Sequence, residues 1–279
     1  MTESDPAVTK FCELHGETDA EALIVRLCRE LAAECTTDQG PSPLNVLGSV
    51  RNVRECRPEH IASDSGCSGL LIPKNGGYEV IVNADEPKER QWFSFAHEIV
   101  HTFFREAYPN ITQPSPEEEF LCDVGAAELT MPLERFRKEM EGQVLSLGLI
   151  DKLHEEFGVS FEAAGRRALH TTDETAGLFV AALARTKDQD LKDVGDPILR
   201  LVSWKTSQTW PDQGSYKNRP IDYDSVIGES FSNLDARSGR GCLGIPFNSS
   251  VFDLEARAYE YPRGAVANYR QVVVLAKVP

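Results

Sequence analysis

The chain has 279 residues, of which 41% are hydrophobic and 26% are charged. This composition excludes the disordered and fibrous classes of protein, and the length is sufficient for two globular domains. The formal net charge is −15. Residues 1–170 hold most of it, with 16 basic against 30 acidic residues, so this part should repel nucleic acid and attract basic partners.

Three further features of the sequence bear on the cellular compartment in which the protein is expected. It begins "MTESDPAVTKFCELHG", which has neither the basic nor the apolar region of a signal peptide. The longest apolar stretch, "GLFVAALA", is too short to span a bilayer. Seven cysteines, an odd number without a regular spacing, indicate reduced thiols. We therefore expect a cytoplasmic protein without a membrane segment.

The first predicted elements are a helix and a small sheet. A helix is expected over residues 18–35, where Thr18 and Glu21 form a capping box ahead of an apolar stripe. The runs "VRNVREC", "GLLIP" and "YEVIVN" have a strand-like composition. Because "KNGG" separates the last two runs, we expect them to form a hairpin.

Helical patterns dominate the next part of the chain. A helix is expected over residues 87–105, with Asp85 or Glu86 as its cap. A second helix should begin after Ser115, its N-cap, with Glu118 closing a capping box. Three more helical patterns follow, as far as about residue 170. The last pattern resembles the second helix of a helix-turn-helix.

Beyond residue 171 the pattern changes to short strand-like runs. They are "AGLFVAALAR", "ILRLVSW", "SVIGESF", "VFDLEARAY" and "YRQVVVLAKV", separated by turns rich in Gly, Pro, Asn and Asp. A mixed N-terminal part followed by a β-rich C-terminal part predicts the α+β class.

The strongest functional signal is "FSFAHEIVHTFFRE". His97 and His101 lie one helical turn apart, so their ring nitrogens can point at one ion. Zinc binds such nitrogens at ~2.0–2.1 Å, and a catalytic site keeps one position for water. Glu98 suits a general base that activates this water. The alternative is a chance match inside an amphipathic helix, which is expected on the order of one per cent of the time in such a chain.

Spacing alone leaves the third ligand open. The metzincin pattern requires Gly and His at positions where this chain has Phe104 and Ala107, so that class is excluded. The segment "EEEFLCD" offers three carboxylates at residues 117–119. Glu118 is assigned to the capping box, and Glu119 is a candidate ligand because Asp123 follows it on the same helical face.

Asp123 lies one helical turn after Glu119 and presents a second carboxylate on the same face. It could accept a hydrogen bond from the far nitrogen of a metal-binding histidine and fix its tautomer. The alternative is a solvated acidic face at a helix N-terminus, where the helix dipole favours negative charge.

The segments "RQWFSFAHEIVHTFF" and "EFLCDVGAAELTMP" together resemble the ImmA/IrrE family of metallopeptidases. The family typically shows a strand ending in Val-Asn, an "RFTLAHELGH"-like helix and an "E-x-x-A/C-N-x-x-A-A-x-L-L-M-P"-like second helix. The resemblance covers roughly residues 20–170 and is concentrated in residues 78–132. The matching positions are Val82, Asn83, Arg90, Phe93, Ala96, His97, Glu98, His101, Glu119, Cys122, Ala126, Ala127, Leu129, Met131 and Pro132.

The resemblance implies that Glu119 joins His97 and His101 as the third metal ligand. It also implies Zn²⁺ as the ion, with Mn²⁺ as an alternative, and Glu98 as the catalytic base. Two positions depart from the family pattern: Asp123 stands where Asn is usual, and Val100 where Gly is usual. The first adds negative charge to the site, and the second alters packing.

A function follows from the same resemblance. It implies an endopeptidase of narrow specificity whose substrate is a helix-turn-helix transcriptional repressor. Cleavage would derepress a stress, DNA-damage or defence operon, including antiphage defence. The alternative is a non-proteolytic anti-repressor or sensor module that binds the repressor and uses the metal structurally.

For the fold, the resemblance implies a zincin-like metallopeptidase domain, which we place in residues 1–132. A helical, helix-turn-helix-like segment is expected in residues 133–172. Residues 173–279 should form a separate β-rich sensor or regulatory domain, which is GAF-like in some family members.

The stretch "RLVSWKTSQTWPDQGSYKNR" interleaves cations with aromatic rings. This combination is typical of single-stranded nucleic acid binding, where cations contact phosphates and rings stack on bases. A simpler alternative is a hairpin whose aromatic rings pack inward, and a third is a surface for substrate docking. The candidate contact residues are Arg200, Trp204, Lys205, Trp210, Lys217 and Arg219.

The segment "SDSGCSGLLIP" places Cys67 just ahead of the first strand of the predicted hairpin. A thiolate there could occupy the fourth metal position at ~2.3 Å and inhibit the enzyme until a signal arrives. The alternative is a small residue packed at the end of a strand.

Overall fold

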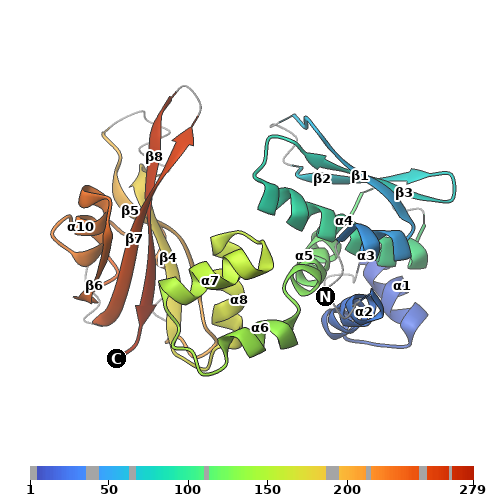
Figure 1. Ribbon diagram of the computed structural model, residues 1–279, viewed down its shortest axis with the longest axis horizontal. Coiled ribbons are helices and arrows are strands. Elements are labelled where there is room, and N and C mark those ends of the chain that lie inside the picture. Colours follow the sequence, from blue (N-terminus) through green and yellow to red (C-terminus); the bar gives the residue numbers. More distant parts are fainter. Residues whose placement is uncertain are drawn as a thin grey trace. The chain divides into compact units, whose positions relative to one another are not determined.

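The computed structural model describes residues 5–35, 44–62, 67–109, 113–186, 195–211, 215–244, 250–263 and 266–279. The chain divides into two compact units. The first comprises Met1–Lys138 and Phe157–Ser160, and the second comprises Glu139–Glu156 and Phe161–Pro279. Each unit combines helices with one sheet (Figure 1). The predicted α+β class and the β-rich C-terminal region are confirmed.

The first unit contains a three-stranded sheet formed by β1 (Val53–Glu59), β2 (Gly69–Lys74) and β3 (Gly77–Asn83). Strands β2 and β3 form the predicted antiparallel hairpin, whereas β1 runs parallel to β3. The strand order β1-β3-β2 leaves β2 at an edge of the sheet. Figure 1 shows the helices of this unit on one side of the sheet.

Among the described residues, six helices belong mainly to the first unit. They are α1 (Pro6–His15), α2 (Ala20–Cys35), α3 (Leu44–Val50), α4 (Lys88–Ala107), α5 (Pro116–Thr130) and α6 (Leu133–Met140). The predicted start of α5 is confirmed, because the Ser115 hydroxyl accepts a hydrogen bond from the Glu118 backbone N–H at 3.0 Å.

Two predicted helix caps are wrong. At the start of α2 the backbone N–H of Ala22 donates to the carboxylate of Asp19 at 2.9 Å, so Asp19 takes the role predicted for Thr18. Helix α4 has Pro87 at its N-cap position without a side-chain cap, so neither Asp85 nor Glu86 fills it. Proline at this position presets the backbone, and α4 is stabilised by burial of its apolar face instead.

Helices α4 and α5 cross at very short range. A Cβ atom added at Gly125 of α5 would lie 2.8 Å from both methyl groups of Val100 in α4. It would also lie 3.0 Å from the sulfur of Cys28 in α2. The absence of a side chain at Gly125 therefore lets the two helices pack closely. This close packing restricts the positions of the side chains that lie between them.

The second unit contains a five-stranded antiparallel sheet with the order β5-β4-β8-β7-β6. Its elements are α7 (Leu147–Phe157), α8 (Phe161–Thr171), β4 (Ala176–Ala184), β5 (Ile198–Thr206), α10 (Val226–Asn233), β6 (Ala236–Gly241), β7 (Phe252–Arg263) and β8 (Val266–Lys277). The run "SVIGESF", predicted as a strand, forms α10 instead. Ser225 caps this helix by accepting a hydrogen bond from the Gly228 backbone N–H at 3.2 Å.

Both faces of the larger sheet are covered. Leu178 and Phe179 are consecutive in β4 and both are buried, although consecutive strand residues point to opposite faces. Phe179 belongs to the core that includes Phe231 of α10. Leu178 lies against α8, where a Cβ at Gly165 would be 2.6 Å from its methyl carbon. The predicted domain boundaries at residues 132 and 172 stay predictions.

Helix α7 is attached to the same sheet by polar contacts. The backbone N–H of Leu147, at the start of α7, donates to the Glu255 carboxylate of β7 at 2.9 Å. Arg257 of β7 forms an ion pair with Asp151 of α7. The two helices of the predicted helix-turn-helix-like segment thus have their own contacts with β7 and β4.

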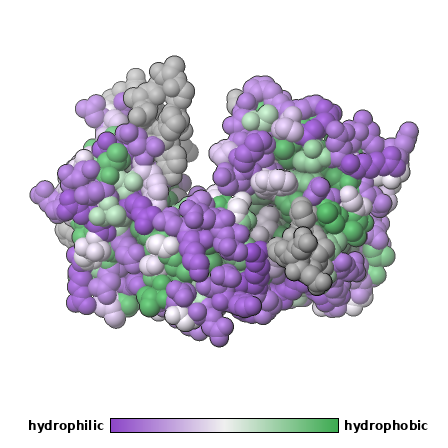
Figure 2. Space-filling model, viewed as in Figure 1, coloured by the Kyte–Doolittle hydropathy of each residue, from purple (hydrophilic) through white to green (hydrophobic). Residues whose placement is uncertain are grey.

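The surface of both units is mostly hydrophilic on the face shown in Figure 2, with hydrophobic residues in smaller patches. Among the described residues, none of the helices combines the length and the apolar character needed to cross a membrane.

Candidate metal centre

Helix α4 carries the three residues of the His-Glu-x-x-His motif. His97 and His101 stand one turn apart, and their ring centroids are 4.9 Å from each other. The His101 side chain is 4% exposed, whereas that of His97 is 14% exposed. The predicted pairing of the two imidazoles on one face of a helix is therefore present in the fold.

Helix α5 brings the Glu119 carboxylate opposite both rings. Nε2 of His97 lies 3.0 Å from one carboxylate oxygen of Glu119, and Nε2 of His101 lies 3.7 Å from the other. Two imidazole nitrogens and one carboxylate, which come from two helices, thus converge on the same small region.

The outer nitrogens of the two rings also face carboxylates. Nδ1 of His97 lies 3.0 Å from Asp123, and Nδ1 of His101 lies 2.7 Å from Glu118. A metal-binding histidine commonly donates its second ring N–H to a carboxylate, which fixes the tautomer and the ring orientation. Each histidine therefore has one nitrogen directed at Glu119 and the other occupied by its own carboxylate.

Electrostatics reflect this crowding of acids around the rings. Burial lowers the pKa of His97, but the hydrogen bonds to Asp123 and Glu119 outweigh it and raise the pKa to about 9. The hydrogen bond with His97 in turn lowers the pKa of Glu119, against the effect of its partial burial. The carboxylates of Asp123 and Glu119 therefore stabilise the positive charge of the protonated His97 ring.

The donor set fits a divalent ion of the zinc type. Two imidazole nitrogens and a carboxylate are a ligand set of catalytic zinc sites, which keep a further position for water. The geometry favours Nε2 of both histidines as the metal-binding atoms, because their Nδ1 atoms already contact carboxylates. The positions of the outer carboxylates agree with such a centre.

Cys122 is a further group near the histidines. Its sulfur and the ligand atoms of His97 and His101 all lie within 4.8 Å of one another, and such a group could hold a metal ion. However, the sulfur contacts Nδ1 of His101 at 3.3 Å, on the side occupied by Glu118 and away from Glu119. Burial also raises the pKa of the Cys122 thiol well above its ordinary value. The position of the sulfur beside Nδ1, on the side of the His101 ring away from Nε2, favours Glu119 over Cys122 as the third ligand.

Glu98 lies on the side of α4 that faces the small sheet. It is only 7% exposed, and its carboxylate lies against Gly69 of β2. A Cβ at Gly69 would be 2.8 Å from Oε1 of Glu98, so a side chain at this point of the strand would displace the carboxylate. Burial raises the pKa of Glu98, while the two histidines oppose this effect.

Glu118 and Gly69 are the two residues that sequence reasoning missed. Glu118 was assigned to a capping box, but its carboxylate contacts His101 and Arg105 instead. A signal was available, because Glu118 falls on the buried stripe of α5 that continues through Cys122 and Ala126. A charged residue on an apolar helical stripe is a strong indication of a specific partner.

Cys67, the predicted inhibitory ligand, lies at the start of β2. Its side chain is partly buried, and its thiol donates a hydrogen bond to the carbonyl oxygen of Gly69 at 2.6 Å. Burial raises the pKa of this thiol, and the nearby Glu98 and Glu119 add to the increase. The thiol is thus near the acidic residues of the site, and its coordination of a metal stays a prediction.

The aromatic residues of the predicted nucleic-acid stretch lie in the second unit and contact one another. Trp210 stacks on Phe252 with ring centroids 5.0 Å apart, and its indole N–H donates to the hydroxyl of Tyr216 at 3.2 Å. Trp204 lies 6.1 Å from the Tyr216 ring. Trp204 and Trp210 are only partly buried, and they pack against the core of the larger sheet.

The cations of the same stretch differ in their surroundings. Arg200 donates to the carbonyl oxygen of Asn218 at 2.8 Å, and Arg219 lies over the ring of Tyr216 at 4.4 Å. Lys205 and Lys217 are exposed. The packed rings agree with the simpler, structural interpretation, while the two exposed lysines keep nucleic-acid binding a testable prediction.

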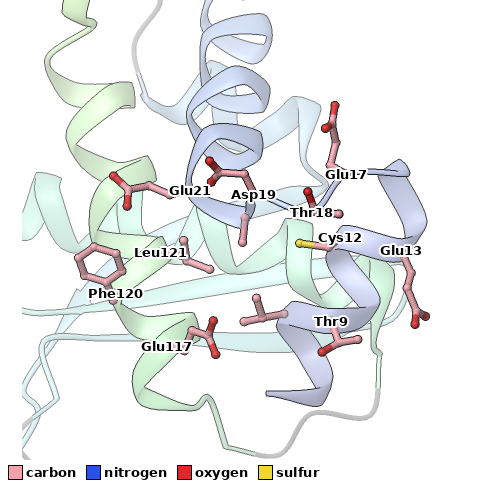
Figure 3. Close-up of a pocket in the computed structure, with 12 residues that line it drawn as sticks. Thr9, Cys12, Glu13, Glu17, Thr18, Asp19, Glu21, Glu117, Phe120 and Leu121 are labelled. Carbon is pink, nitrogen blue, oxygen red and sulfur yellow. The ribbon is translucent and has the colours of Figure 1, made fainter. Parts of the chain in front are cut away.

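A pocket of about 730 Å³ lies elsewhere in the first unit, between α1, α2 and α5 (Figure 3). Acidic side chains surround it, and Phe120 and Leu121 contribute apolar surface. None of the residues that line it belongs to the predicted metal centre.

The fold and the site define a mixed α+β protein with a candidate metal centre of the metallopeptidase type. Residues 62–169 match the model of the family described as Peptidase_M78, the IrrE N-terminal-like domain. The family resemblance is thereby confirmed: the chain carries a domain of the ImmA/IrrE family. The matched range includes α4, α5 and the β2–β3 hairpin.

Among solved structures, the chain is similar to one described as a Mycobacterium tuberculosis transcriptional regulator. The TM-score is 0.57 at 12% sequence identity, and the match covers 98% of this chain and 80% of that chain. At this identity the likeness concerns the fold alone. No curated protein matches the chain.

Proposed function

We propose that the chain is a zinc-dependent endopeptidase that cleaves a partner helix-turn-helix transcriptional repressor. His97, His101 and Glu119 are the proposed metal ligands, and Glu98 is the proposed catalytic base. Zn²⁺ is the expected ion, with Mn²⁺ as an alternative. The observation that carries the proposal is the convergence of two Nε2 atoms on the two oxygens of one carboxylate.

The chemistry follows from the donor set and from Glu98. When bound, a zinc ion supplies Lewis-acid chemistry by lowering the pKa of a water molecule and polarising the peptide carbonyl. Glu98 accepts the proton of the attacking water and delivers it to the amide nitrogen that leaves. Its near-complete burial keeps competing solvent away from this proton, and the contact with Gly69 limits where the carboxylate can lie.

The position of β2 supports a peptide as substrate. Gly69 of β2 borders Glu98, and β2 is an edge strand whose outer side has no partner strand among the described residues. An extended peptide can pair with such an edge through backbone hydrogen bonds and so place its own amide bond next to the base. We propose this edge of a zincin-like domain as the substrate-binding side.

The proposed repressor is supported by charge and by the family. The acidic balance of residues 1–170 suits a basic, DNA-binding substrate. The similar structure from Mycobacterium tuberculosis is described as a transcriptional regulator, which agrees with a role in transcription. We propose that cleavage derepresses a stress, DNA-damage or defence operon in the cytoplasm, and that residues 173–279 form a GAF-like sensor of the signal.

A glutamine at position 98 tests the mechanism. Glu98→Gln should retain zinc, because Glu98 is not a proposed ligand, while cleavage of the repressor encoded beside this chain's gene should fall by about 10²–10⁴-fold. Glu89→Gln is the matched control, because Glu89 lies on the same helix near its start. Metal content and the intact mass of the repressor are measured after co-incubation.

Two outcomes would contradict the proposal. Cleavage by Glu98→Gln at the wild-type rate would exclude the base. An intact repressor that is nevertheless released from its DNA by wild-type protein would support the non-proteolytic anti-repressor instead.

A further inference from the structure

We propose that Glu118 is a positioning residue of the metal centre. Its carboxylate holds the His101 imidazole so that Nε2 is directed towards His97 and Glu119. The inference rests on the proposed function and deepens it, because Glu118 acts through its contact with His101.

The contact between Glu118 and His101 is short and excluded from water. Oε1 of Glu118 lies 2.7 Å from Nδ1 of His101, and the side chains are 0% and 4% exposed. A hydrogen bond to a carboxylate is strong, and in a buried site water cannot replace it. When Nδ1–H donates to Glu118, Nε2 carries the lone pair and is the nitrogen available to a metal.

The other histidine has a weaker version of the same support. Nδ1 of His97 contacts Asp123 at 3.0 Å, and the Asp123 side chain is 64% exposed. Solvent competes for that contact and screens its charge. The structure therefore assigns most of the orientation of the ligand pair to His101 and Glu118.

Glu118 is itself held from two sides. Its backbone N–H donates to the hydroxyl of Ser115 at 3.0 Å, which fixes the first turn of α5. The guanidinium of Arg105, one turn after His101 on α4, donates to the same carboxylate oxygen at 3.2 Å. Arg105, Glu118 and His101 form a chain of contacts that joins α4 to α5 behind the proposed ligands.

Stabilisation of the helix N-terminus does not explain this arrangement. Glu117 lies in the same turn of α5 and can interact with the helix dipole while exposed. In Glu118, by contrast, Oε2 is buried without a hydrogen-bond partner. An incompletely paired buried carboxylate costs stability, and such violations are concentrated at functional sites.

Cys122 does not replace Glu118 in this role. Its sulfur lies 3.3 Å from Nδ1 of His101, farther than the carboxylate oxygen. One ring N–H directs its hydrogen bond to the nearer and more strongly accepting oxygen.

The test compares the zinc affinities of three variants with that of the wild-type protein. Glu118→Gln keeps the shape of the side chain, Glu118→Ala removes it, and Glu117→Gln is the control on the same turn. Affinity is measured in the full chain by competition with a chromogenic chelator, with zinc alone as the probe. Loss of an outer-shell partner typically weakens metal binding 10–100-fold, so we expect about 10-fold for Gln and up to about 100-fold for Ala. Glu117→Gln should bind like wild type.

Thermal unfolding of the metal-free proteins separates positioning from a structural role. A positioning role predicts that metal-free Glu118→Gln unfolds at or above the wild-type temperature, while zinc raises this temperature less than in wild type. If Glu118→Ala does not fold, the isosteric Gln variant decides. Wild-type zinc affinity in Glu118→Gln would overturn the inference alone, whereas absence of zinc binding by the wild-type protein would overturn the proposed function with it.

Discussion

Replacement of Gly69 by alanine should impair catalysis without removing the metal. The added Cβ would lie 2.8 Å from Oε1, 3.1 Å from Cγ and 3.3 Å from Cδ of Glu98. The strand cannot retreat freely, because Gly69 is paired with Val82 in the β2–β3 hairpin. The Glu98 carboxylate must therefore move by about 0.6 Å to restore ordinary van der Waals contact.

The size of the effect follows from the role of Glu98. A general base contributes about 10²–10⁴-fold to the rate, and a displacement of about 1 Å can cost about 10²-fold. We therefore expect Gly69→Ala to lower the rate of repressor cleavage about 10–100-fold. Zinc affinity should stay at the wild-type value, since Glu98 is not a proposed ligand.

A double-mutant cycle shows whether the effect passes through Glu98. In the Glu98→Gln background the base is already lost, so Gly69→Ala should cause little further decrease. The control is Gly148→Ala on α7, where the nearest atom to the added Cβ is 3.8 Å away and activity should not change. An equal loss from Gly69→Ala in both backgrounds would refute the reasoning and indicate that the alanine disturbs substrate pairing at β2.

Three other predictions concern the ion, the thiol and the C-terminal unit. With a pKa raised to about 9, His97 carries a proton at pH 7 that zinc must displace, so zinc affinity should rise with pH up to about 9 and then level off. An affinity that is flat between pH 6.5 and 8.5 contradicts this. In the Co²⁺-substituted protein, a Cys67 ligand gives a sulfur-to-metal charge-transfer band that Cys67→Ser abolishes while basal cleavage rises. Absence of the band in the wild type, with unchanged basal cleavage in the variant, rejects this ligand. A short single-stranded oligonucleotide should bind in a salt-dependent manner and raise cleavage, and charge reversal at Lys205 and Lys217 should weaken it. An oligonucleotide that does not bind at low salt removes nucleic acid as the signal.

The parts of the site that sequence could predict are those fixed by local geometry. The spacing of His97 and His101 determines that both rings share one face of a helix, whatever the helix packs against. The same rule places Glu119 and Asp123 together, and Ser115 with the following proline marks where α5 begins. These features depend on residues within one or two turns of each other.

The parts that sequence reasoning missed depend on tertiary contacts. Glu118 satisfies the spacing of a capping box, yet its carboxylate contacts His101 and Arg105 on another helix. Gly69 begins an ordinary strand pattern, and only the approach of α4 shows that a side chain there would meet Glu98. In the second unit, "SVIGESF" has strand-like composition, but Ser225 caps it as a helix. Propensity is a weak guide where packing decides.

One departure from the family pattern shows such a tertiary contact directly. Val100 stands where the family usually has glycine, and its two methyl groups occupy the space that a Cβ at Gly125 would fill. Gly125 thus leaves room for the Val100 side chain at the crossing of the two helices. The crossing keeps Glu119 opposite the histidines.

The second departure bears on charge. Arg105 contributes one guanidinium to a site in which the two imidazoles are surrounded by four carboxylates, those of Glu98, Glu118, Glu119 and Asp123. Asp123 makes this excess larger than the usual asparagine would, and a proton held on His97 offsets part of it. A divalent ion would offset more, because it would bring two charges to the place where Nε2 of both rings and the Glu119 oxygens converge. A proton and an ion would therefore compete for the proposed site, and the charge of Asp123 would favour the binding of either.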